Sequence, residues 1–301
     1  MAGEVMATLE ARDLQAIDNI LYEAPKEELV ARSILNVKTD VHPGAEFYGY
    51  NVLTRSGSAK IIANGADDIP MVDTDMTRHI VTIYSIATSF RVSIQEQRAA
   101  QLTNSPIDAT KAETARRAIS EKENNISFIG DKKFNIMGIA NATGIQISNA
   151  AANGTGSSTK WSTKTSEQII EDVRLAKKKI TVLPGYGGAV LVLALPPDQY
   201  EELNRRYSDF DSRTIRKVLE ENSWFAGGIK RVADLTGVGT SKTDAMIIMD
   251  TAKSTAELLL PMDITRHKEE YKFPNTKVPL EERFGGVILR APQAVIRVDG
   301  I

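Results

Sequence analysis

The order of three segments along the chain constrains its fold more than any other feature. Val41–Asp75 has the composition of an exposed two-stranded ribbon, Ile80–Ser93 alternates as a pair of strands does, and Asp108–Ile129 has the pattern of one long charged helix. A ribbon and strands ahead of a single long helix predict a mixed α+β fold with an element that extends from the body.

The ribbon is predicted from two β-rich runs, Glu46–Thr54 (EFYGYNVLT) and Ser58–Asn64 (SAKIIAN), joined by the short connection Arg55-Ser56-Gly57. In the first run apolar side chains occur at both odd and even positions, so both faces of the strand are apolar. An isolated two-stranded ribbon is marginally stable in water, and its edges invite pairing with other chains. We therefore expect an assembly arm that contacts a neighbouring molecule; a hairpin packed on its own core is the alternative. The residues expected to make the contact are Phe47, Tyr48, Tyr50, Lys60 and Ile62.

The long helix is predicted from an apolar stripe with three-, four- and seven-residue steps, formed by Ala112, Ala115, Ile119, Ile126 and Ile129. Charged residues occupy the other faces and include the i,i+4 pairs Glu113–Arg117 and Arg117–Glu121. Asp108 is suited to cap the start and Gly130 to end the helix, whose length is roughly 33 Å at the standard rise. An ordinary amphipathic surface helix of an enzyme is the alternative. The polar side chains expected to face water or adjacent subunits are Lys111, Arg116, Arg117 and Glu121.

Composition excludes several classes of protein. With 301 residues, 42% of them hydrophobic and 25% charged, the chain can bury one large core or two modest ones. The 37 basic and 39 acidic residues give a formal net charge of −2, so no basic field marks a sequence-specific nucleic-acid binder. There are no cysteines, which removes disulfides, thiolate nucleophiles and cysteine-ligated zinc. The N-terminus lacks a signal-peptide pattern and no apolar run approaches membrane-spanning length, so we expect a chain that stays in the cytoplasm where it is made.

The remaining segments suggest an interrupted architecture. Met1–Asp40 is acidic and helical in pattern and is expected to form an N-terminal arm. A stretch rich in Gly, Ser, Thr and Asn, Asn149–Thr165, has the composition of a surface loop or domain junction. The block after it alternates between helices and strands, whereas the chain from Ala256 onward is mostly extended. The elements expected in these two blocks are Ser166–Ile180, Ala189–Leu195, Asp198–Arg206, Thr214–Glu221, Ile229–Leu235, Ala245–Asp250, Leu258–Pro261, Tyr271–Phe273, Gly286–Leu289 and Ala294–Val298.

Motifs that would indicate catalysis or a bound ion do not have the required spacing. The Gly-rich runs Gly154–Lys160 and Gly237–Thr243 lack the glycine that precedes the lysine of a phosphate loop. The three histidines are scattered, and no G-x-S-x-G sequence is present. The acidic residues Asp67, Asp68, Asp73 and Asp75 offer oxygen ligands for Ca²⁺, but without the EF-hand order they fit a solvated rim better. We expect no catalytic, cofactor-binding or metal site, and no enzymatic activity.

A further pattern extends over Val41–Gly138. It comprises Val41-His42-Pro43-Gly44-Ala45-Glu46, then Gly57–Asn64 with Asp67-Asp68-Ile69-Pro70, then Glu96–Ala100, and finally Lys111 through Ala115-Arg116-Arg117-Ala118 to Glu123-Asn124 and Gly130-Asp131. This combination resembles tailed-phage major capsid proteins of the Hong Kong-type fold, a family formerly of unknown function. Pro261-Met262 and Val287–Val298 are compatible with the resemblance, whereas Ile145–Lys164 offers nothing diagnostic.

The resemblance implies an α+β capsid fold in five parts. Residues 1–40 would form the N-terminal arm, 41–75 an extended E-loop hairpin, and 76–144 a peripheral P-domain whose spine helix is 108–129. Residues 145–255 would form the α/β axial A-domain, and 256–301 would be strands that return to the P-domain. No catalytic residues and no cofactors come with this family.

The resemblance also implies a function: a subunit that assembles through pentamers and hexamers into an icosahedral shell around double-stranded DNA, made in the cytoplasm of a bacterial host and located in the virion capsid. DNA contacts would be non-specific; portal, scaffold and decoration proteins are further possible partners, and no membrane is expected. Encapsulins, which are bacterial protein-cage compartments, share the fold, so a compartment that encloses an enzyme is the alternative, and a soluble α/β enzyme is the third hypothesis. Some capsids of this fold join an E-loop lysine to an asparagine of a neighbour. Lys60 is the only lysine between Val41 and Asp75, but an exposed charge on the ribbon is the favoured interpretation.

Overall fold

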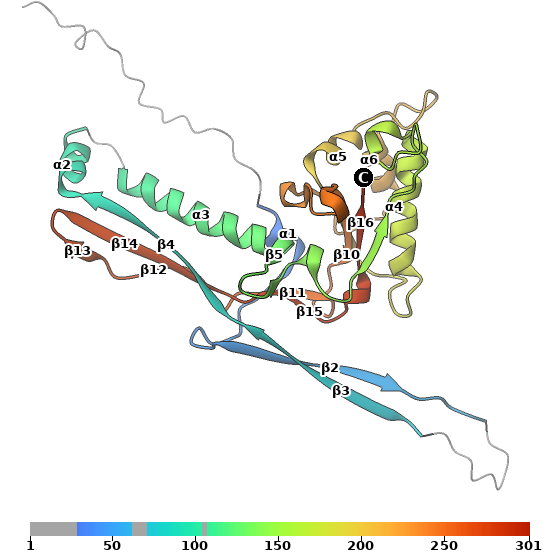
Figure 1. Ribbon diagram of the computed structural model, residues 1–301, viewed down its shortest axis with the longest axis horizontal. Helices are drawn as coiled ribbons and strands as arrows, with labels where there is room; N and C mark the ends of the chain where they lie inside the picture. The colour runs from blue at the N-terminus through green and yellow to red at the C-terminus, as the bar shows by residue number, and fades with distance from the viewer. Residues whose placement is uncertain (1–28, 62–70, 104–106) are drawn as a thin grey trace, which may run out of the picture.

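The computed structural model describes residues 29–61, 71–103 and 107–301. Figure 1 shows three parts: a long sheet with helix α3 (Ile107–Ile129) along it, an α/β part that contains the C-terminus, and a two-stranded ribbon that extends away from both. The mixed α+β architecture predicted from the sequence is confirmed.

The ribbon consists of β2 (Phe47–Ser56) and β3 (Asp73–Thr82), which pair antiparallel along their whole length. The prediction that Ser58–Asn64 is the partner strand is wrong: residues 58–61 are not strand, and 62–64 lie outside the described residues. Gly57 suggested a tight turn, but the partner strand begins only at Asp73. Residues 73–80 are all exposed to water, so neither face of β3 requires the apolar alternation by which a strand is detected in a sequence.

The chain leaves the ribbon at Ile83, which is buried, and continues as β4 (Tyr84–Ser93) in the long sheet. β4 pairs along its whole length with β14 (Asn275–Phe284). The sequence predicts a pair of strands, Ile80–Ile86 and Phe90–Ile94, but the change of strand lies at Ile83 and residues 84–93 form one continuous strand. The other edge of β14 pairs with β12 (Met262–Arg266) and β13 (Glu270–Lys272).

Helix α3 confirms the predicted long helix, although it begins at Ile107, so that Asp108 is its second residue and does not precede it. Ala115 and Ile119 are buried against Leu280 of β14, as the apolar stripe predicts. The helix ends at Gly130, where φ is 78° and a Cβ atom would lie 2.5 Å from the carbonyl oxygen of Ile136. Only glycine fits this close approach. Helix α2 (Ile94–Thr103) precedes α3.

The α/β part is built on a five-stranded sheet in the order β7-β16-β10-β8-β9. Helix α4 (Ser166–Thr181) packs on this sheet through its apolar stripe and starts at a capping box between Thr165 and Gln168, so the helix predicted there is confirmed. Not all of 256–301 lies beside the long sheet, since its last strand, β16, lies between β7 and β10. A strand buried at every position, as β16 is, is typical of a sheet centre. The strands are β7 (Gln146–Asn149), β8 (Leu191–Leu195), β9 (Ile229–Arg231), β10 (Ala245–Asp250) and β16 (Val295–Asp299).

The long sheet and the α/β part share one hydrophobic core. Phe128 of α3 and Phe284 of β14 belong to the same buried cluster as Ile247 of β10 and Val295 of β16. A three-stranded sheet, β1 (Asn36–Lys38), β11 (Ala256–Leu259) and β15 (Gly286–Leu289), lies at this junction. The short elements that complete the fold are α1 (Ala31–Ile34), β5 (Gly130–Asp131), β6 (Ile136–Met137), α5 (Pro197–Glu202), α6 (Ile215–Glu221), and the 3-10 turns Ile139–Asn141, Trp161–Thr163, Ala233–Leu235, Thr240–Lys242 and Pro292–Ala294.

Candidate assembly surfaces

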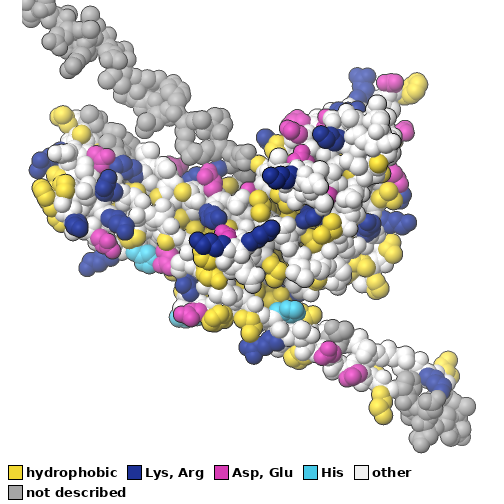
Figure 2. Space-filling view, in the orientation of Figure 1, with side chains coloured by type: hydrophobic (Ala, Val, Ile, Leu, Met, Phe, Trp, Pro, Cys, Tyr) yellow, Lys and Arg dark blue, Asp and Glu magenta, His cyan; other side chains and the backbone are white. Residues whose placement is uncertain are grey.

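The ribbon exposes apolar side chains that a monomer does not need at its surface. Figure 2 shows apolar side chains on the described part of the ribbon. Solitary exposed apolar residues are normal, but a row of them on one projecting element indicates an interaction surface. The large apolar side chains exposed on the ribbon and on the described residues at its far end are Phe47, Leu53, Ile61, Met71, Val72, Met76 and Ile80.

The predicted contact residues of the ribbon have different surroundings. Phe47 is 63% exposed, whereas Tyr48 and Tyr50 pack against a small buried cluster at the root of the ribbon. The Tyr50 hydroxyl donates to the carbonyl oxygen of Leu289 at 3.2 Å, and burial raises the Tyr50 pKa. Both tyrosines therefore anchor the ribbon to its own subunit. Lys60 is exposed at the far end, and Ile62 lies outside the described residues.

The polar residues predicted on α3 also divide into two kinds. Lys111 lies 2.9 Å from the Glu96 carboxylate and donates to the carbonyl oxygen of Arg91, which fastens α3 to α2 and β4. The predicted pair Arg117–Glu121 is formed, with a distance of 2.8 Å between Nε and Oε1. Arg116 is exposed to solvent.

A cluster of buried acidic residues on α3 and β14 was not predicted. Arg32 of the N-terminal segment donates to Glu123 from both Nε and Nη2, at 2.7–3.1 Å, and also to Asp263 at 3.0 Å and Glu282 at 3.2 Å. We call these four residues the Arg32 cluster. Beside it, the Asn124 side chain accepts hydrogen bonds from the backbone N–H groups of residues 30 and 31, so two adjacent residues of α3 hold the N-terminal segment in place.

One carboxyl group of the Arg32 cluster is protonated at neutral pH. The Glu282 side chain is fully buried, and this burial together with the charge of Glu123 raises the pKa of Glu282 to about 9. The buried oxygen Oε2 of Glu282 has no hydrogen-bond partner within the described chain, and a neutral carboxyl group tolerates this better than a charged carboxylate does. The position of Glu123 was a detectable signal: it falls on the apolar stripe of α3, between Ile119 and Ile126.

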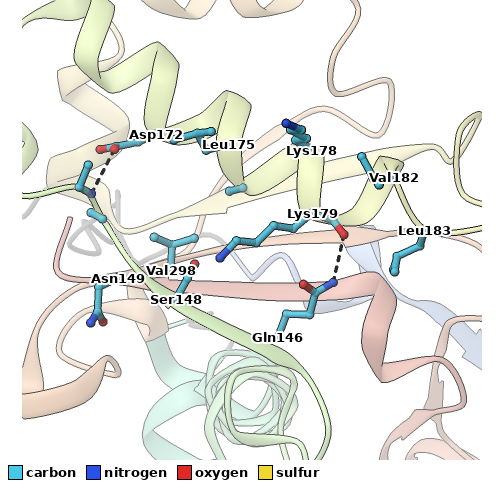
Figure 3. Close-up of a pocket in the computed structure, with 13 residues that line it drawn as sticks. Gln146, Ser148, Asn149, Asp172, Leu175, Lys178, Lys179, Val182, Leu183 and Val298 are labelled. Atoms are coloured by element: carbon cyan, nitrogen blue, oxygen red, sulfur yellow. Dashed lines mark hydrogen bonds between the residues drawn. The ribbon is translucent and has the colours of Figure 1, made fainter.

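The α/β part has an apolar groove at one edge of its sheet. A cavity of about 510 Å³ lies between α4 and the edge strand β7. Figure 3 shows Leu175, Val182 and Leu183 along its α4 side, with Lys178 and Lys179 between them. The side chain of Gln146 on β7 donates to the carbonyl oxygen of Lys179 and closes the floor. We call this cavity the α4–β7 groove.

Other sites considered in the sequence do not form in the described chain. Within residues 29–61, 71–103 and 107–301, no three His, Cys, Asp or Glu side chains are arranged to hold a metal ion. Asp73 and Asp75 are exposed on β3, and Asp67 and Asp68 lie outside these residues. No helix of the described chain is both long and apolar enough to cross a membrane.

Comparison with known proteins identifies the class to which this fold belongs. The structure is similar to the capsid of Myoviridae phage XM1, with a TM-score of 0.81 and 11% sequence identity over 98% of this chain and 100% of that one. A virus-like particle from Pyrococcus furiosus superposes with a TM-score of 0.62 and 15% identity over 88% and 90% of the two chains. The Hong Kong-type capsid fold predicted from the sequence is confirmed.

Sequence comparison then places the chain in a family. Residues 57–301 match the profile of the Major capsid protein family, so the chain belongs to that family and is a capsid shell protein. It is also similar to the type 1 encapsulin shell protein EncA of Myxococcus xanthus, with 21% identity over 268 residues, which cover 87% of this chain and 84% of EncA. This likeness is distant.

Proposed function

We propose that this protein is the structural subunit of a tailed-phage or prophage capsid, which assembles in the cytoplasm of a bacterial host into an icosahedral shell around double-stranded DNA. The observation that carries the proposal is the outer part of the ribbon. Its apolar side chains are exposed, and no other surface of the described chain covers them. Such a surface needs a neighbouring copy to cover it. Many modest interfaces of this kind sum to a closed particle.

The five-part division follows from this role. We assign residues 41–75 to the E-loop, 76–144 to the P-domain with α3 as its spine helix, 145–255 together with β16 to the A-domain, and the rest of 256–301 to strands that return to the P-domain. In this assignment the Arg32 cluster is the point at which the N-terminal arm, residues 1–40, is fastened to its own spine helix. Portal, scaffold and decoration proteins are further partners consistent with a phage capsid.

The cargo separates the two shell hypotheses. A phage coat encloses DNA, and contacts to phosphates depend on salt and not on base sequence. An encapsulin-like shell, favoured only by the distant similarity to EncA, would enclose an enzyme. Particles purified from cells that contain the complete phage or prophage are expected to protect genome-length DNA from nuclease. Particles with one stoichiometric enzyme and no DNA would leave the fold assignment intact and overturn the coat assignment.

The role of the ribbon is tested by a truncation designed on its pairing. Val52 pairs with Thr77, so replacing residues 52–77 by a short Gly-Ser turn removes the outer ribbon and keeps the anchored root at Tyr48 and Tyr50. The truncated subunit should retain its circular dichroism spectrum and sediment as small species, because the lost contacts are between copies. Replacing Glu113, an exposed residue of α3, by alanine serves as a surface control. Complete particles from the truncated subunit would show that the ribbon is not an assembly arm.

A further inference from the structure

The α4–β7 groove exists because the sheet ends before the helix that covers it. The stripe of α4 that includes Val173 and Ile180 packs on the inner strands, where the sheet side chains are buried and apolar. At the edge, the β7 side chains that line the groove are polar: Gln146, Ser148 and Asn149. The neighbouring residues of the helix, such as Leu175, therefore extend past the edge of the sheet. Val182, which follows the helix, is 69% exposed.

The exposed charged groups that line the groove are positive, because the carboxylate of Asp172 is buried and paired with Lys164. Lys178 and Lys179 lie in the last turn of α4 and line the cavity together with Leu175, which is 40% exposed. In Figure 3 Lys178 lies on the same side of the opening as Leu175 and Val182, whereas the Lys179 side chain extends across the hollow toward Ser148 and Val298. An apolar hollow with a basic rim selects for an apolar side chain that is accompanied by negative charge.

A side chain of this kind is present elsewhere on the α/β part. Phe210 is fully exposed in the loop between α5 and α6, and its neighbours in the chain are Asp209 and Asp211. The loop is held in this shape, since the Tyr207 N–H donates to the Arg213 carbonyl oxygen at 2.8 Å and Arg213 pairs with Asp211. The exposed ring therefore lies on an ordered loop. Asp211 is paired with Arg213, whereas Asp209 forms no ion pair with the described residues.

Other exposed aromatic side chains fit the groove less well. Phe273 follows Lys272 and Phe134 follows two lysines, so a basic rim would repel these two segments. Tyr271 lies between Glu270 and Lys272, but it is part of strand β13, which is already paired with β14. Phe47 follows Glu46, but it sits where the ribbon joins the body and its strand is already paired. Among the described aromatic residues, Phe210 alone combines full exposure, a loop tip and acidic neighbours.

We propose that Phe210 of one copy inserts into the α4–β7 groove of the next copy, with Asp209 near Lys178 and Lys179 of that copy. This inference rests on the proposed function, because it requires copies that assemble side by side. The projecting ring and the groove are different patches of one subunit, so the contact is heterologous and each copy offers both halves. A heterologous contact repeats around a ring, as the pentamers and hexamers of a capsid require.

Cysteine trapping tests the contact directly, because the chain contains no cysteine of its own. Single variants Phe210→Cys and Val182→Cys would be mixed as unassembled subunits, assembled and exposed to a mild oxidant. The expected product is a disulfide-linked dimer in the mixture and none in either variant alone. A mixture of Phe210→Cys with Leu102→Cys, which is 88% exposed on α2, is the matched control. Dimers from Phe210→Cys alone, or equal yields with Leu102→Cys, would overturn the proposal.

Two substitutions that need no oxidation give an independent measurement. Phe210→Ser removes the inserted ring and Leu175→Arg fills the groove with a charge, and each should raise the subunit concentration needed for assembly by about tenfold or more, as loss of an interface anchor does. Circular dichroism checks that each variant is folded. If the parent forms particles and both folded variants do so at the parent's concentration, this contact is refuted while the proposed function stands. Failure of the parent chain to form particles under any condition would count against the proposed function itself.

Discussion

Replacing Glu282 by glutamine should change how the stability of the subunit depends on pH while leaving the fold intact. In the Arg32 cluster one guanidinium faces three carboxyl groups, and it lies nearest to Glu123, at 2.7 Å, and farthest from Glu282, at 3.2 Å. The fully buried Glu282 is therefore the group that retains a proton. Glutamine has nearly the same shape as a protonated glutamate and can donate from the same position.

The size of the effect follows from the two pKa values of Glu282. Its ordinary value of 4.5 applies in the unfolded chain, and a value of about 9 applies in the folded subunit. The stabilisation is fully present below pH 4.5 and is lost as pH rises through about 9, because unfolding releases one proton between these values. A one-proton difference lowers the free energy of unfolding by about 1.4 kcal/mol per pH unit, or roughly 2–3 kcal/mol between pH 6 and pH 8.

Urea unfolding of the dissociated subunit at both pH values measures this change. Between pH 6 and pH 8 the free energy of unfolding of the parent should fall by about 2–3 kcal/mol more than that of Glu282→Gln, because glutamine has no carboxyl proton to lose. Glu96→Gln is the matched control: hydrogen bonds from Ser93 and Lys111 lower the Glu96 pKa, so Glu96 is ionised in both states throughout this range. A difference between parent and Glu282→Gln that is the same at pH 6 and pH 8 would show that Glu282 is charged in the folded subunit.

Two further substitutions test the long helix and its end. Ala115→Pro should abolish soluble expression, because proline inside a helix costs about 3 kcal/mol or more. Glu113→Ala, on the exposed face, should change the free energy of unfolding by no more than about 0.5 kcal/mol. Equal melting temperatures of the two variants would rule out a continuous helix. Gly130→Ala should destabilise the subunit by more than about 1 kcal/mol, because its Cβ would meet the Ile136 carbonyl oxygen at 2.5 Å, and an unchanged urea midpoint would contradict that close approach.

The elements that were predicted correctly are those whose residue pattern reports their burial: strands buried at every position, such as β8, and helices with one exposed and one buried face. Helix α3 buries Ala115 and Ile119 and exposes Glu113, and this contrast is written into its sequence at a helical period. The partner strand of the ribbon lacks the contrast, because its residues from Asp73 to Ile80 are all in water. Its pairing depends on the register with β2, which no local pattern in the sequence reports.

The Arg32 cluster was missed for a different reason. In the strand that contains Glu282, burial alternates along the chain, and the neighbouring glutamate, Glu281, pairs with Ser85 and His267 at the surface. Two consecutive glutamates therefore have opposite environments, and nothing in their residue type distinguishes them. The alternation of Val278, Leu280 and Phe284 places Glu282 on the buried face of the strand, but its contact with α3 and Arg32 is tertiary, and no local pattern in the sequence reports it.

The ribbon and the Arg32 cluster together explain why one subunit can be both stable and ready to assemble. The root of the ribbon is anchored to its own core by Tyr48 and Tyr50, and the N-terminal segment is anchored to α3 by Arg32, so both extensions leave the body from fixed points. The outer ribbon, by contrast, exposes Leu53 and Met76, whose burial requires another chain. Fixed roots reduce the conformational entropy lost when a neighbour docks, so individually weak contacts between copies can sum to a closed shell.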